Sequence, residues 1–476
     1  MVDLSSNVKN MIVVADAHRN AARWHEAIQF YLQLNQAIPQ ETSIKQNLAL
    51  CYFALADFNM CNALCNEVIL LDPALWQARI LLAKCDRKLG KPLRAEAEFK
   101  RVLLQNAQNG EALLGLADLA LNEFGDPRGA IDWVRPLMSG TAYRDDAQLT
   151  YLMASLYDRD ISATELNQAV IDFSKAAIQL SASVMPRFKH LANVKRASRL
   201  RVGLISPLFS ASPVYFLTIA FFKALAPQSD LIFLNRGTQS DWATAEFKAI
   251  ASEWHDLSAR SATELARFLH AQDLDVLYDL GGWMDPIALK ALSVKPVRRQ
   301  LKWVGGQSVT TGLDAFDGWI GDHWQSPLAS QGLYTEPLIN AVDDYAQYTP
   351  PPYLPKPASS KSDVLAIFAN PAKVSRAFLE KISTIPGKKC FIHRQFQYSQ
   401  VQARIEAILK PSDVEYLCPG SHLEALEAVN RHAVILDTFP YSSGLTAREV
   451  MAMGSQIHVL SVGSLFCERH TARYQS

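Results

Sequence analysis

The chain has 476 residues, 49% of them hydrophobic, which is enough for two or three domains with large cores. Lysine plus arginine and aspartate plus glutamate number 47 each, so the balanced charge gives no electrostatic footprint for nucleic acid. We therefore expect no nucleic-acid partner.

No apolar run reaches the roughly 20 residues of a membrane span, and the first residues lack the basic start and long apolar stretch of a signal peptide. The seven cysteines show no metal-site spacing with one another or with histidine. We interpret them as reduced packing thiols, and we expect a cytoplasmic protein without a membrane span.

A period of about 34 residues, the tetratricopeptide length, runs through the first third of the chain. Three kinds of position recur with this period: a small residue, a bulky residue and a helix-ending residue. They fall at Ala27, Cys61 and Ala95, at Tyr31, Cys65 and Phe99, and at Pro39, Pro73 and Ala107. Each unit is a helix pair that buries its apolar face only by stacking on its neighbours. We predict an α-solenoid of such repeats over residues 1–185.

The concave surface of a solenoid suits a protein or peptide partner. Two alternatives stay open for this region. The repeats can act as a structural spacer, or they can act as a dimerisation arm, so a homodimer is possible.

From Arg199 the pattern changes to strands that alternate with helices, which predicts a parallel sheet covered on both faces. We assign this domain to residues 198–347. The predicted strands are 199–207, 230–237, 274–282, 298–306 and 316–322, and the predicted helices are 212–225, 242–254, 262–272 and 285–294.

A segment rich in proline and serine, residues 348–362, is typical of a linker. A second alternating set follows over residues 363–476, with predicted strands at 364–370, 388–394, 414–420, 433–439 and 456–462 and helices at 377–385, 398–409, 422–430 and 447–454. Ligands of open α/β sheets bind outside the carboxyl ends of the strands, so two such sheets predict a nucleotide-type ligand between Rossmann-like halves. No GxGxxG motif follows the first strand, which argues against NAD or FAD.

One candidate binding element lies where the strand at 433–439 passes into a helix. Ser442, Ser443, Gly444 and Thr446 form this junction. Backbone N–H groups point outward at such a junction, and the helix dipole there favours an anion. We predict that it holds a phosphate.

Basic side chains follow two other strands of the second half. Lys373 comes just after a strand, from where it can reach a diphosphate as a point charge, although a solvated helix lysine is the plainer interpretation. Arg469 and His470 follow the last strand and can face the same cleft, although such a pair is often ordinary surface.

In the first half, the loops at strand ends are residues 206–213, 281–283 and 303–312. Glycine allows a ligand to approach the backbone closely, and hydroxyl groups can bond sugar or peptide groups, although ordinary turns have the same composition. The candidate acceptor-side residues are Gly282, Gln307, Ser308, Thr310 and Thr311.

We find no paired carboxylates, no Ser/His/Asp order and no HExxH or DxD metal motif, so no catalytic residue is assigned. We expect no metal and no cofactor. Lysine, arginine and helix N-termini would then stabilise the charge of a leaving group.

Several stretches between about Leu200 and Arg469 together resemble a known family. They are "LRVGLISPLF", "LDVLYDLGGW", "KPVRRQLKWVGGQSVTTGLDAFDGWIGDHWQSP", "LYTEPL", "FANPAK" and "LDTFPYSSGLTAREVMAMG". The family is that of the O-linked N-acetylglucosamine transferases, including their bacterial members and the related glucosyltransferases of adhesins. The resemblance implies tetratricopeptide repeats followed by a GT-B body of two Rossmann-like domains.

The resemblance also implies a reaction. Such enzymes transfer a sugar from a UDP-sugar to a protein hydroxyl, with inversion and without a metal. By position, Lys373 and Thr446 match groups on the diphosphate, Asn370 matches an amide that contacts uridine or sugar, and Glu449 matches the acid near the ribose. Arg469 aligns with an arginine after the final strand, and the junction with Ser443 and Gly444 holds the phosphates.

The chain departs from the family pattern at its histidines. Ser212, Trp283 and Ala425 stand at histidine positions, and Gly444 or Leu445 stands at another. A conventional general base is therefore missing from its expected place. Family members also continue with helices that cross back to the first half, so we expect either a shortened chain or a cleft closed in another way.

Three functions follow from these patterns. The first is a UDP-sugar-dependent protein glycosyltransferase that moves N-acetylglucosamine or a hexose to an acceptor held by the repeats. The second is a non-catalytic scaffold or co-subunit on a decayed transferase fold, favoured by the lost histidines. The third is a transferase that acts on polysaccharide or lipid.

Overall fold

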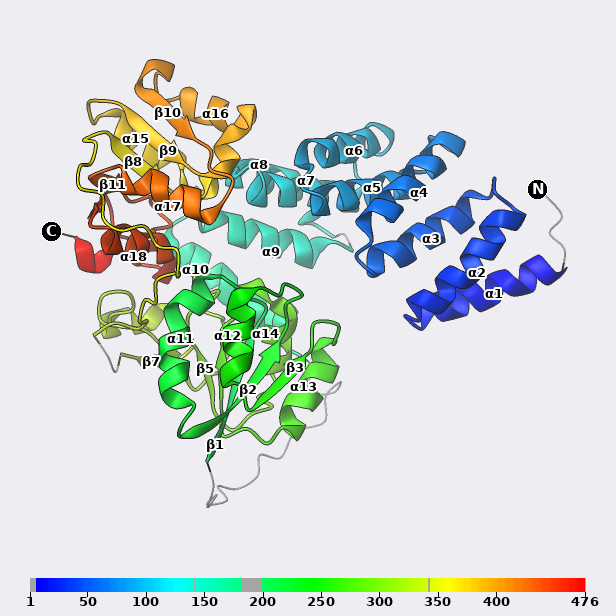
Figure 1. Cartoon of the computed structure of the whole chain (residues 1–476), viewed down its shortest axis with the longest axis horizontal. Helices are drawn as coiled ribbons and strands as arrows, with labels where there is room; N and C mark the ends of the chain where they lie inside the picture. Colours follow the sequence, from blue (N-terminus) through cyan, green and yellow to red (C-terminus); the bar gives the residue numbers. More distant parts are fainter. Residues whose placement is uncertain (1–5, 141, 181–198, 341–342, 476) are drawn as a thin grey trace. The chain divides into compact units, whose positions relative to one another are not determined.

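The computed structural model describes residues 6–140, 142–180, 199–340 and 343–475. The chain divides into two compact units, Met1–Tyr151 and Leu152–Ser476, and the boundary falls inside helix α9 (Arg144–Ser155). Figure 1 shows helices alone in the first unit and two sheets with covering helices in the second.

The first unit is a row of helix pairs, as the repeat period predicts. Neighbouring helices in sequence pack against each other along the row (Figure 1). The helices are α1 (Ser6–Asn20), α2 (Trp24–Ala37), α3 (Thr42–Ala54), α4 (Phe58–Leu71), α5 (Trp76–Lys88), α6 (Pro92–Gln105), α7 (Gly110–Asn122) and α8 (Pro127–Val134), with a short 3-10 turn at Arg135–Leu137.

The repeated positions form the core between the helices. The small residues at 27, 61 and 95 are fully buried, and the bulky residues at 31, 65 and 99 are at most 2% exposed. The small side chains allow close helix contact and the bulky ones fill the space behind it. The sequence interpretation of these two position classes is therefore confirmed.

A further repeated position was not apparent from the sequence pattern. Ala22, Ala56 and Gly90 have φ of 56°, 60° and 70°, and each ends the first helix of a pair. The next residue donates its N–H back across the turn, as from Asp57 to the Tyr52 carbonyl at 2.9 Å. This is the left-handed helix end that glycine favours, and alanine occupies it twice. The sequence did not indicate this helix end, because alanine ordinarily favours the interior of a helix.

The second unit contains a seven-stranded parallel sheet in the order β3-β2-β1-β4-β5-β6-β7. Its strands are β1 (Leu200–Ser206), β2 (Ser229–Asn235), β3 (Glu253–Asp256), β4 (Val276–Asp279), β5 (Gln300–Lys302), β6 (Gly318–Ile320) and β7 (Leu338–Ile339). Its helices are α11 (Pro213–Leu225), α12 (Trp242–Ile250), α13 (Ala262–Ala271) and α14 (Pro286–Leu292).

A five-stranded parallel sheet follows in the order β10-β9-β8-β11-β12. Its strands are β8 (Leu365–Phe368), β9 (Lys389–Ile392), β10 (Val414–Leu417), β11 (Val434–Leu436) and β12 (Gln456–His458). Its helices are α15 (Arg376–Ser383), α16 (Ser399–Glu406), α17 (His422–Asn430) and α18 (Leu445–Ala452). The strand order reverses beside β1 in the first sheet and beside β8 in the second, which are the places where such sheets bind ligands.

Two elements differ from the sequence prediction. The helix predicted over 242–254 ends at Ile250, and its last residues enter strand β3, where Trp254 stacks on Phe233 with ring centroids 5.7 Å apart. The predicted repeat domain extends to residue 185, but the first compact unit ends at Tyr151. Helix α10 (Ala163–Phe173) with its π-helical end therefore lies in the second unit.

The end of α10 is fastened to loops of the seven-stranded sheet. Ser174 donates from Oγ to the Thr311 carbonyl at 2.5 Å, and Gln179 donates to the Ser293 carbonyl at 3.1 Å. Helix α10 thus has the amphipathic pattern of a repeat helix, and its end bonds to the α/β body.

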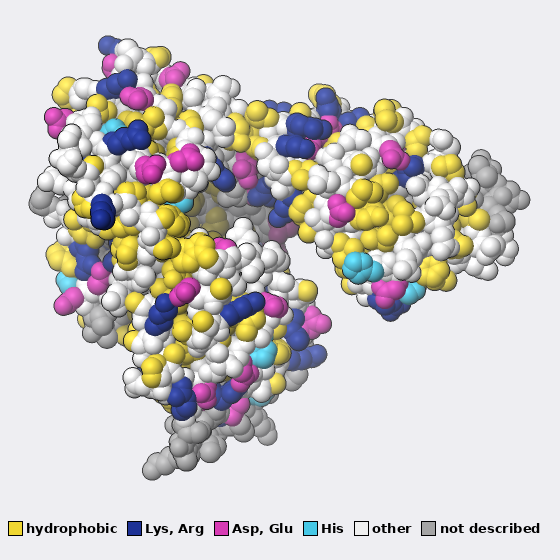
Figure 2. Space-filling view, viewed as in Figure 1, with side chains coloured by type: hydrophobic (Ala, Val, Ile, Leu, Met, Phe, Trp, Pro, Cys, Tyr) yellow, Lys and Arg dark blue, Asp and Glu magenta, His cyan; other side chains and the backbone are white. Residues whose placement is uncertain are grey.

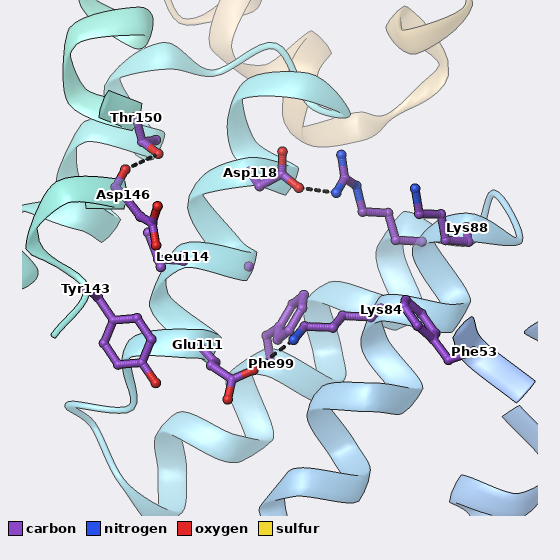
Figure 3. Close-up of a pocket in the computed structure, with 12 residues that line it drawn as sticks. Phe53, Lys84, Lys88, Phe99, Glu111, Leu114, Asp118, Tyr143, Asp146 and Thr150 are labelled. Carbon is purple, nitrogen blue, oxygen red and sulfur yellow. Dashed lines mark hydrogen bonds and ion pairs between the residues drawn. The ribbon is translucent and has the colours of Figure 1, made fainter. Parts of the chain in front are cut away.

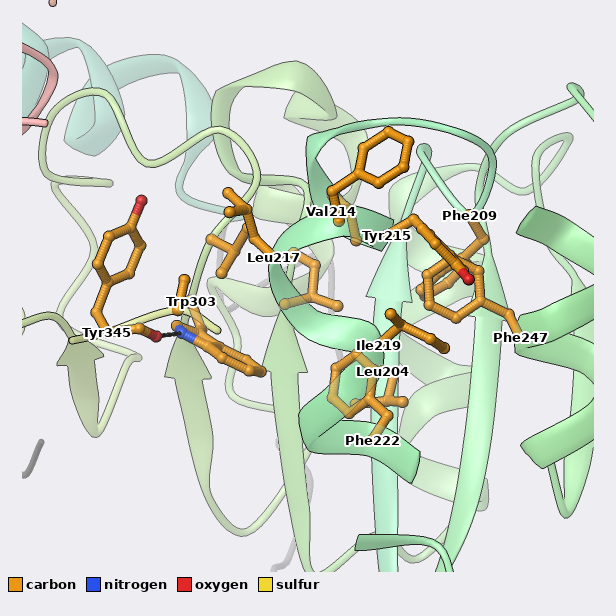
Figure 4. Close-up of a cluster of buried hydrophobic side chains, with 14 of the residues drawn as sticks. Leu204, Phe209, Val214, Tyr215, Leu217, Ile219, Phe222, Phe247, Trp303 and Tyr345 are labelled. Atoms are coloured by element: carbon orange, nitrogen blue, oxygen red, sulfur yellow. Dashed lines mark hydrogen bonds between the residues drawn. The ribbon is translucent and has the colours of Figure 1, made fainter. Parts of the chain in front are cut away.

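The core of the seven-stranded sheet is aromatic. Figure 4 shows Leu204 of β1 next to Phe222 of α11, with Phe247 and Phe209 packed to one side. Trp303 closes the other side, and its indole N–H donates to the Tyr345 carbonyl at 2.8 Å (Figure 4). Close packing of this kind fixes where the strand-end loops emerge.

We expect Phe222→Ala to lower the free energy of unfolding by about 3–5 kcal/mol, because Phe222 is fully buried and its loss leaves a cavity. The neighbouring Phe221 is 39% exposed, so Phe221→Ala should cost less than about 2 kcal/mol. Urea unfolding followed by tryptophan fluorescence measures both. Equal losses in the two variants would contradict this description of the core.

Candidate functional site

The central cavity lies where loops of both sheets of the second unit meet, and it has a volume of about 320 Å³. It opens between the loops after β1, β4 and β5 and those after β8 and β11, at the two places where strand order reverses. Its lining is mostly apolar. The lining residues are Leu208, Pro213, Val214, Leu217, Met284, Val304, Gly305, Gly306, Gln307, Tyr345, Lys373, Tyr441, Gly444, Leu445, Thr446, Phe466 and His470.

A second cavity, of about 380 Å³, lies at the carboxyl ends of β8, β9 and β10 and the start of α17 and α18. It is called the donor cavity after the donor-side residues that the sequence predicts there. Lys373, Leu445 and Thr446 line both cavities. The other residues of the donor cavity are Phe368, Ala369, Asn370, His393, Arg394, Pro419, Gly420, Ser421, His422, Ala425 and Glu449.

Lys373 is half-buried at the junction of the two cavities. Its Nζ donates to the Ser442 carbonyl at 3.0 Å and lies 4.6 Å from the centre of the Tyr441 ring. Burial lowers the pKa of Lys373 to about 8, and the Asp437 carboxylate opposes this shift. A cation in this state gains from a bound anion, because the anion restores its lost solvation.

The turn that contains Ser442 and Ser443 is held from within. The Ser443 N–H donates to Asp437 Oδ1 at 2.8 Å, and Ser442 donates from Oγ to the Cys467 carbonyl at 2.8 Å. Neither serine lines a cavity. Of the predicted junction residues, Gly444 and Thr446 alone line one, so the hydroxyls of the serines shape the turn, and the start of α18 faces the open space.

Glu449 of α18 is 1% exposed and lines the donor cavity. Its Oε1 lies 3.0 Å from His422 Nε2, whose Nδ1 is 3.1 Å from the Tyr353 hydroxyl. Within the described residues, neither carboxylate oxygen has a hydrogen bond of good geometry. Burial raises the pKa of Glu449, and His422 opposes the shift. A buried acceptor in a cavity wall is prepared for a ligand hydroxyl.

Of the two remaining predicted donor-side residues, one lines the donor cavity and the other does not. Asn370 lines the donor cavity, and its Oδ1 accepts from the Ala372 N–H at 2.9 Å. Arg469 lines neither cavity: it donates from Nε to the Trp324 carbonyl and from Nη1 to the Gly463 carbonyl, both at 2.9 Å. Its neighbour His470, which the sequence analysis considered together with Arg469, lines the central cavity.

On the acceptor side, Gln307 lines the central cavity and donates from Nε2 to the Ile320 carbonyl at 2.9 Å. Its buried Oε1 has no partner among the described residues. Ser308 lies behind the wall, with Oγ 2.9 Å from the Tyr441 hydroxyl. This contact joins a loop of the first sheet to the turn of the second.

Thr310 and Thr311 face away from the cavity. Thr310 donates from Oγ1 to Glu336 Oε2 at 2.7 Å, and the Thr311 N–H donates to Glu336 Oε1 at 2.8 Å. Glu336 is fully buried, so these bonds satisfy its carboxylate. The two threonines therefore hold the loop in place.

The predicted glycine Gly282 brings two loops together. Gly282 has φ of +50°, and a Cβ there would lie 2.8 Å from the Gly306 carbonyl oxygen. Gly306 has φ of +66°, and a Cβ there would lie 2.0 Å from the Gly281 oxygen. The glycines therefore allow two loops of the same domain, at residues 281–282 and 306, to approach each other closely.

The side chains at the family's histidine positions have structural partners. Ser212 caps α11, accepting from the Val214 N–H at 3.2 Å. Trp283 is buried and donates from Nε1 to the Thr310 carbonyl at 3.0 Å. Ala425 lies in the wall of the donor cavity.

Sequence reasoning missed Tyr441 and Lys302. Tyr441 stacks on Tyr157, with ring centroids 4.7 Å apart, and carries the Lys373 ammonium on its ring. Lys302 is fully buried in β5 and donates to the Gly305 carbonyl at 2.6 Å. Burial lowers the pKa of Lys302, and Asp279 opposes this. A lysine inside an apolar strand gave no signal of its own.

The first unit has a cavity of its own, of about 630 Å³ (Figure 3). Basic and acidic side chains pair across it: Lys84 binds Glu111 at 2.7 Å, and Arg87 binds Asp118. Its lining residues are Phe53, Lys84, Arg87, Lys88, Phe99, Glu111, Leu114, Gly115, Asp118, Tyr143, Asp146 and Thr150. Figure 2 shows the same mixture of basic and acidic side chains over the visible face of the molecule.

Across the ranges that the structure describes, no group of three or more His, Cys, Asp or Glu side chains is placed to hold a metal ion. No helix in those ranges has the length and apolar character needed to cross a bilayer.

We expect Gly306→Ala to lower the free energy of unfolding by about 2 kcal/mol or more, because alanine is strained at this φ and its Cβ would meet a carbonyl oxygen. The loop would also shift away from the central cavity. Gly332→Ala is the control, since nothing lies within 4 Å of a Cβ there. Thermal unfolding of both variants tests this, and a stable Gly306→Ala would contradict the close crossing.

No protein-family model matches the chain. Curated relatives include a probable UDP-N-acetylglucosamine–peptide N-acetylglucosaminyltransferase SPINDLY of Solanum lycopersicum, 23% identical over 344 residues, which are 66% of this chain and 36% of that protein. The Arabidopsis thaliana protein SEC, with the same enzyme description, is 26% identical over 176 residues, 34% of this chain and 18% of that protein. The chain thus spans about a third of the length of the SPINDLY relatives that it matches.

Among solved structures, a variant of the Thermobaculum terrenum O-GlcNAc transferase superposes with a TM-score of 0.64 at 19% identity, covering 98% of this chain and 86% of that one. This confirms the predicted fold class, tetratricopeptide-type repeats followed by a GT-B body of two Rossmann-like domains. The sequence relatives and this structure thus show what the chain is similar to, namely proteins described as O-linked N-acetylglucosamine transferases.

Proposed function

We propose that the protein is a glycosyltransferase that moves a sugar from a UDP-sugar to a hydroxyl of a polypeptide. One observation carries the proposal: the half-buried Lys373 ammonium lies beside the start of α18, where the central and donor cavities meet. An ammonium, a helix N-terminus and the Thr446 hydroxyl together suit a diphosphate.

The nucleoside would occupy the donor cavity. Glu449 supplies a buried carboxylate with open acceptor capacity, which suits the two neighbouring hydroxyls of a ribose. Asn370 supplies an amide in the same wall. The sugar would then extend into the central cavity, past Lys373.

Catalysis would rest on charge stabilisation. When the glycosidic bond to the diphosphate breaks, negative charge grows on the leaving oxygen beside Lys373 and the α18 N-terminus. Preformed donors in a partly desolvated site stabilise such charge without reorganisation. The proposal therefore includes a metal-independent reaction without cofactor, with attack by the acceptor from the opposite face of the sugar and inversion of its configuration.

The acceptor would be a protein, as in the printed descriptions of the relatives, which name a peptide substrate. Gln307, in the first-sheet wall of the central cavity, has a free acceptor oxygen for it. The repeat-unit cavity offers aromatic and charged side chains for a polypeptide. All seven cysteines are free thiols, six of them buried, which supports a reducing, cytoplasmic location.

A non-catalytic scaffold is the second candidate. Ser212 and Trp283, at two histidine positions of the family, have structural bonds of their own, as expected in a fold that has lost its chemistry. Against it, Lys373 and Glu449 lie in cavity walls, where burial shifts the pKa of each toward its neutral form.

We expect Lys373→Met to weaken UDP binding about 10–100-fold, because it removes the ammonium that binds the diphosphate. Lys381→Met is the matched control, since Lys381 is exposed at the end of α15. Calorimetry measures UDP affinity, and mass spectrometry of a co-expressed host proteome measures transfer.

The expected result is a new hexose or N-acetylhexosamine on protein, lost in Lys373→Met and kept in Lys381→Met. UDP binding without any transfer would favour the scaffold, and modified glycan without modified protein would favour a polysaccharide acceptor. No UDP binding by the wild-type chain would overturn the proposal.

UDP affinity should also fall as the pH rises above 8. Lys373 has a lowered pKa of about 8, so the cation is present below that pH and is lost above it. The bound diphosphate favours the charged form, so binding takes up a proton near pH 8.5, and affinity falls by up to about tenfold per pH unit.

Calorimetry in buffers of different ionisation enthalpy measures the proton uptake. Lys373→Arg is the control, because arginine keeps its charge throughout this range. An equal fall in affinity in that variant would show that a group other than Lys373 titrates.

A further inference from the structure

His470 is a titratable residue of the central cavity that the proposed reaction has not used. It follows the 3-10 turn Phe466–Glu468 and lines the cavity with Lys373 and Gly444. Its N–H donates to Ser442 Oγ at 2.9 Å, and its ring meets Phe466 edge-on with centroids 5.6 Å apart. The imidazole is therefore fixed at both its backbone and its ring.

The ring lies beside the start of α18. A Cβ on Gly444, the residue before α18, would lie 3.8–3.9 Å from three atoms of the His470 ring. The segment after β12 thus brings an imidazole to the amino-terminal end of α18.

Burial, with two neighbouring cations, keeps His470 neutral. Burial lowers the pKa of His470 to about 3, and the Lys373 and Arg448 cations add to the effect. Arg448 is itself paired with Asp344 at 2.6 Å. The other titratable neighbour, Tyr441, has its ring centroid 5.9 Å away, and burial raises its pKa well above the usual value. No carboxylate is among the groups that shift His470.

A contact with Gln325 sets the tautomer. The Gln325 Nε2 amide is hydrogen-bonded to His470 Nδ1. A neutral imidazole that accepts at Nδ1 carries its proton on Nε2. Among the described residues, Nε2 has no hydrogen-bond partner, so the ring offers one unused N–H donor to the cavity that it lines.

We propose that His470 is a catalytic residue that donates a neutral Nε2–H hydrogen bond to the diphosphate of the donor substrate, on the same group that Lys373 binds. This inference rests on the proposed function. The Lys373 ammonium supplies a positive charge, and the His470 imidazole supplies a hydrogen bond of fixed direction. Both interactions strengthen as the leaving oxygen gains negative charge. Gln325 is a positioning residue, because it acts by fixing the tautomer.

The test compares UDP affinity in three full-length proteins. His470→Val removes the donor and should weaken UDP binding at least about tenfold. His470→Gln keeps an N–H donor and should stay within about threefold of wild type. Because the imidazole is neutral, the ratio between the valine variant and wild type should be the same at pH 5.5 and pH 7.5.

Nitrogen NMR of histidine-labelled wild-type protein gives an independent measurement. The signal that disappears in His470→Gln should show the Nε2–H tautomer and should not titrate between pH 5 and 9. This measurement stands even if the valine variant fails to fold.

A titration near pH 6.5, an Nδ1–H tautomer, or a valine variant that binds UDP as tightly as wild type would overturn the inference. Each of these results leaves the proposed function intact if Lys373→Met still loses UDP. A wild-type chain that does not bind UDP at all would instead overturn the proposed function.

Discussion

The Lys373 ammonium is partly desolvated, and this constraint organises the site. It is held by the Ser442 carbonyl and the Tyr441 ring, and within the described part of the chain no carboxylate lies at ion-pair distance from it. An ammonium solvated by a dipole and a ring is less stable than one in water, which is why its pKa falls. Lys373 is buried in this way because the strand-end loops of both sheets meet around it. A bound anion would recover the lost stability, so the same burial that destabilises the free protein supplies binding energy.

The sequence predicted the fold class because its signals are periodic. Apolar faces of helices and strands must be buried, and this requirement produces a periodic pattern. It explains the burial of residues 27, 61 and 95 and the alternation of strands and helices. The contacts of α10 were not predictable in the same way, since α10 is amphipathic whichever body it packs on. Lys373 and Thr446 follow recognisable strands, and topology brings both to the wall of one cavity, whereas Glu449 of α18 was predicted only through the family resemblance.

The rest of the site depended on contacts between distant segments, which periodicity does not report. Thr310 and Thr311 have the composition of a ligand loop, but they satisfy Glu336, 25 or 26 residues later in the chain. Arg469 and its neighbour could be told apart only by which side chain the Phe466 turn directs to the cavity. The family's histidine positions show the same limit: Trp283 and Ser212 would be counted as losses from sequence alone, whereas each makes a bond that holds a loop.

The turn Phe466–Glu468 contacts both halves of the second unit. Phe466 packs against Trp319 of the seven-stranded sheet with ring centroids 5.1 Å apart, while the Cys467 carbonyl accepts from Ser442 in the five-stranded half. A movement that separates the two sheets of the second unit would expose Phe466 to solvent, which costs on the order of 2 kcal/mol of free energy. Under the proposed function, a product release that requires the two halves to separate would be slowed by this loss of Phe466 burial.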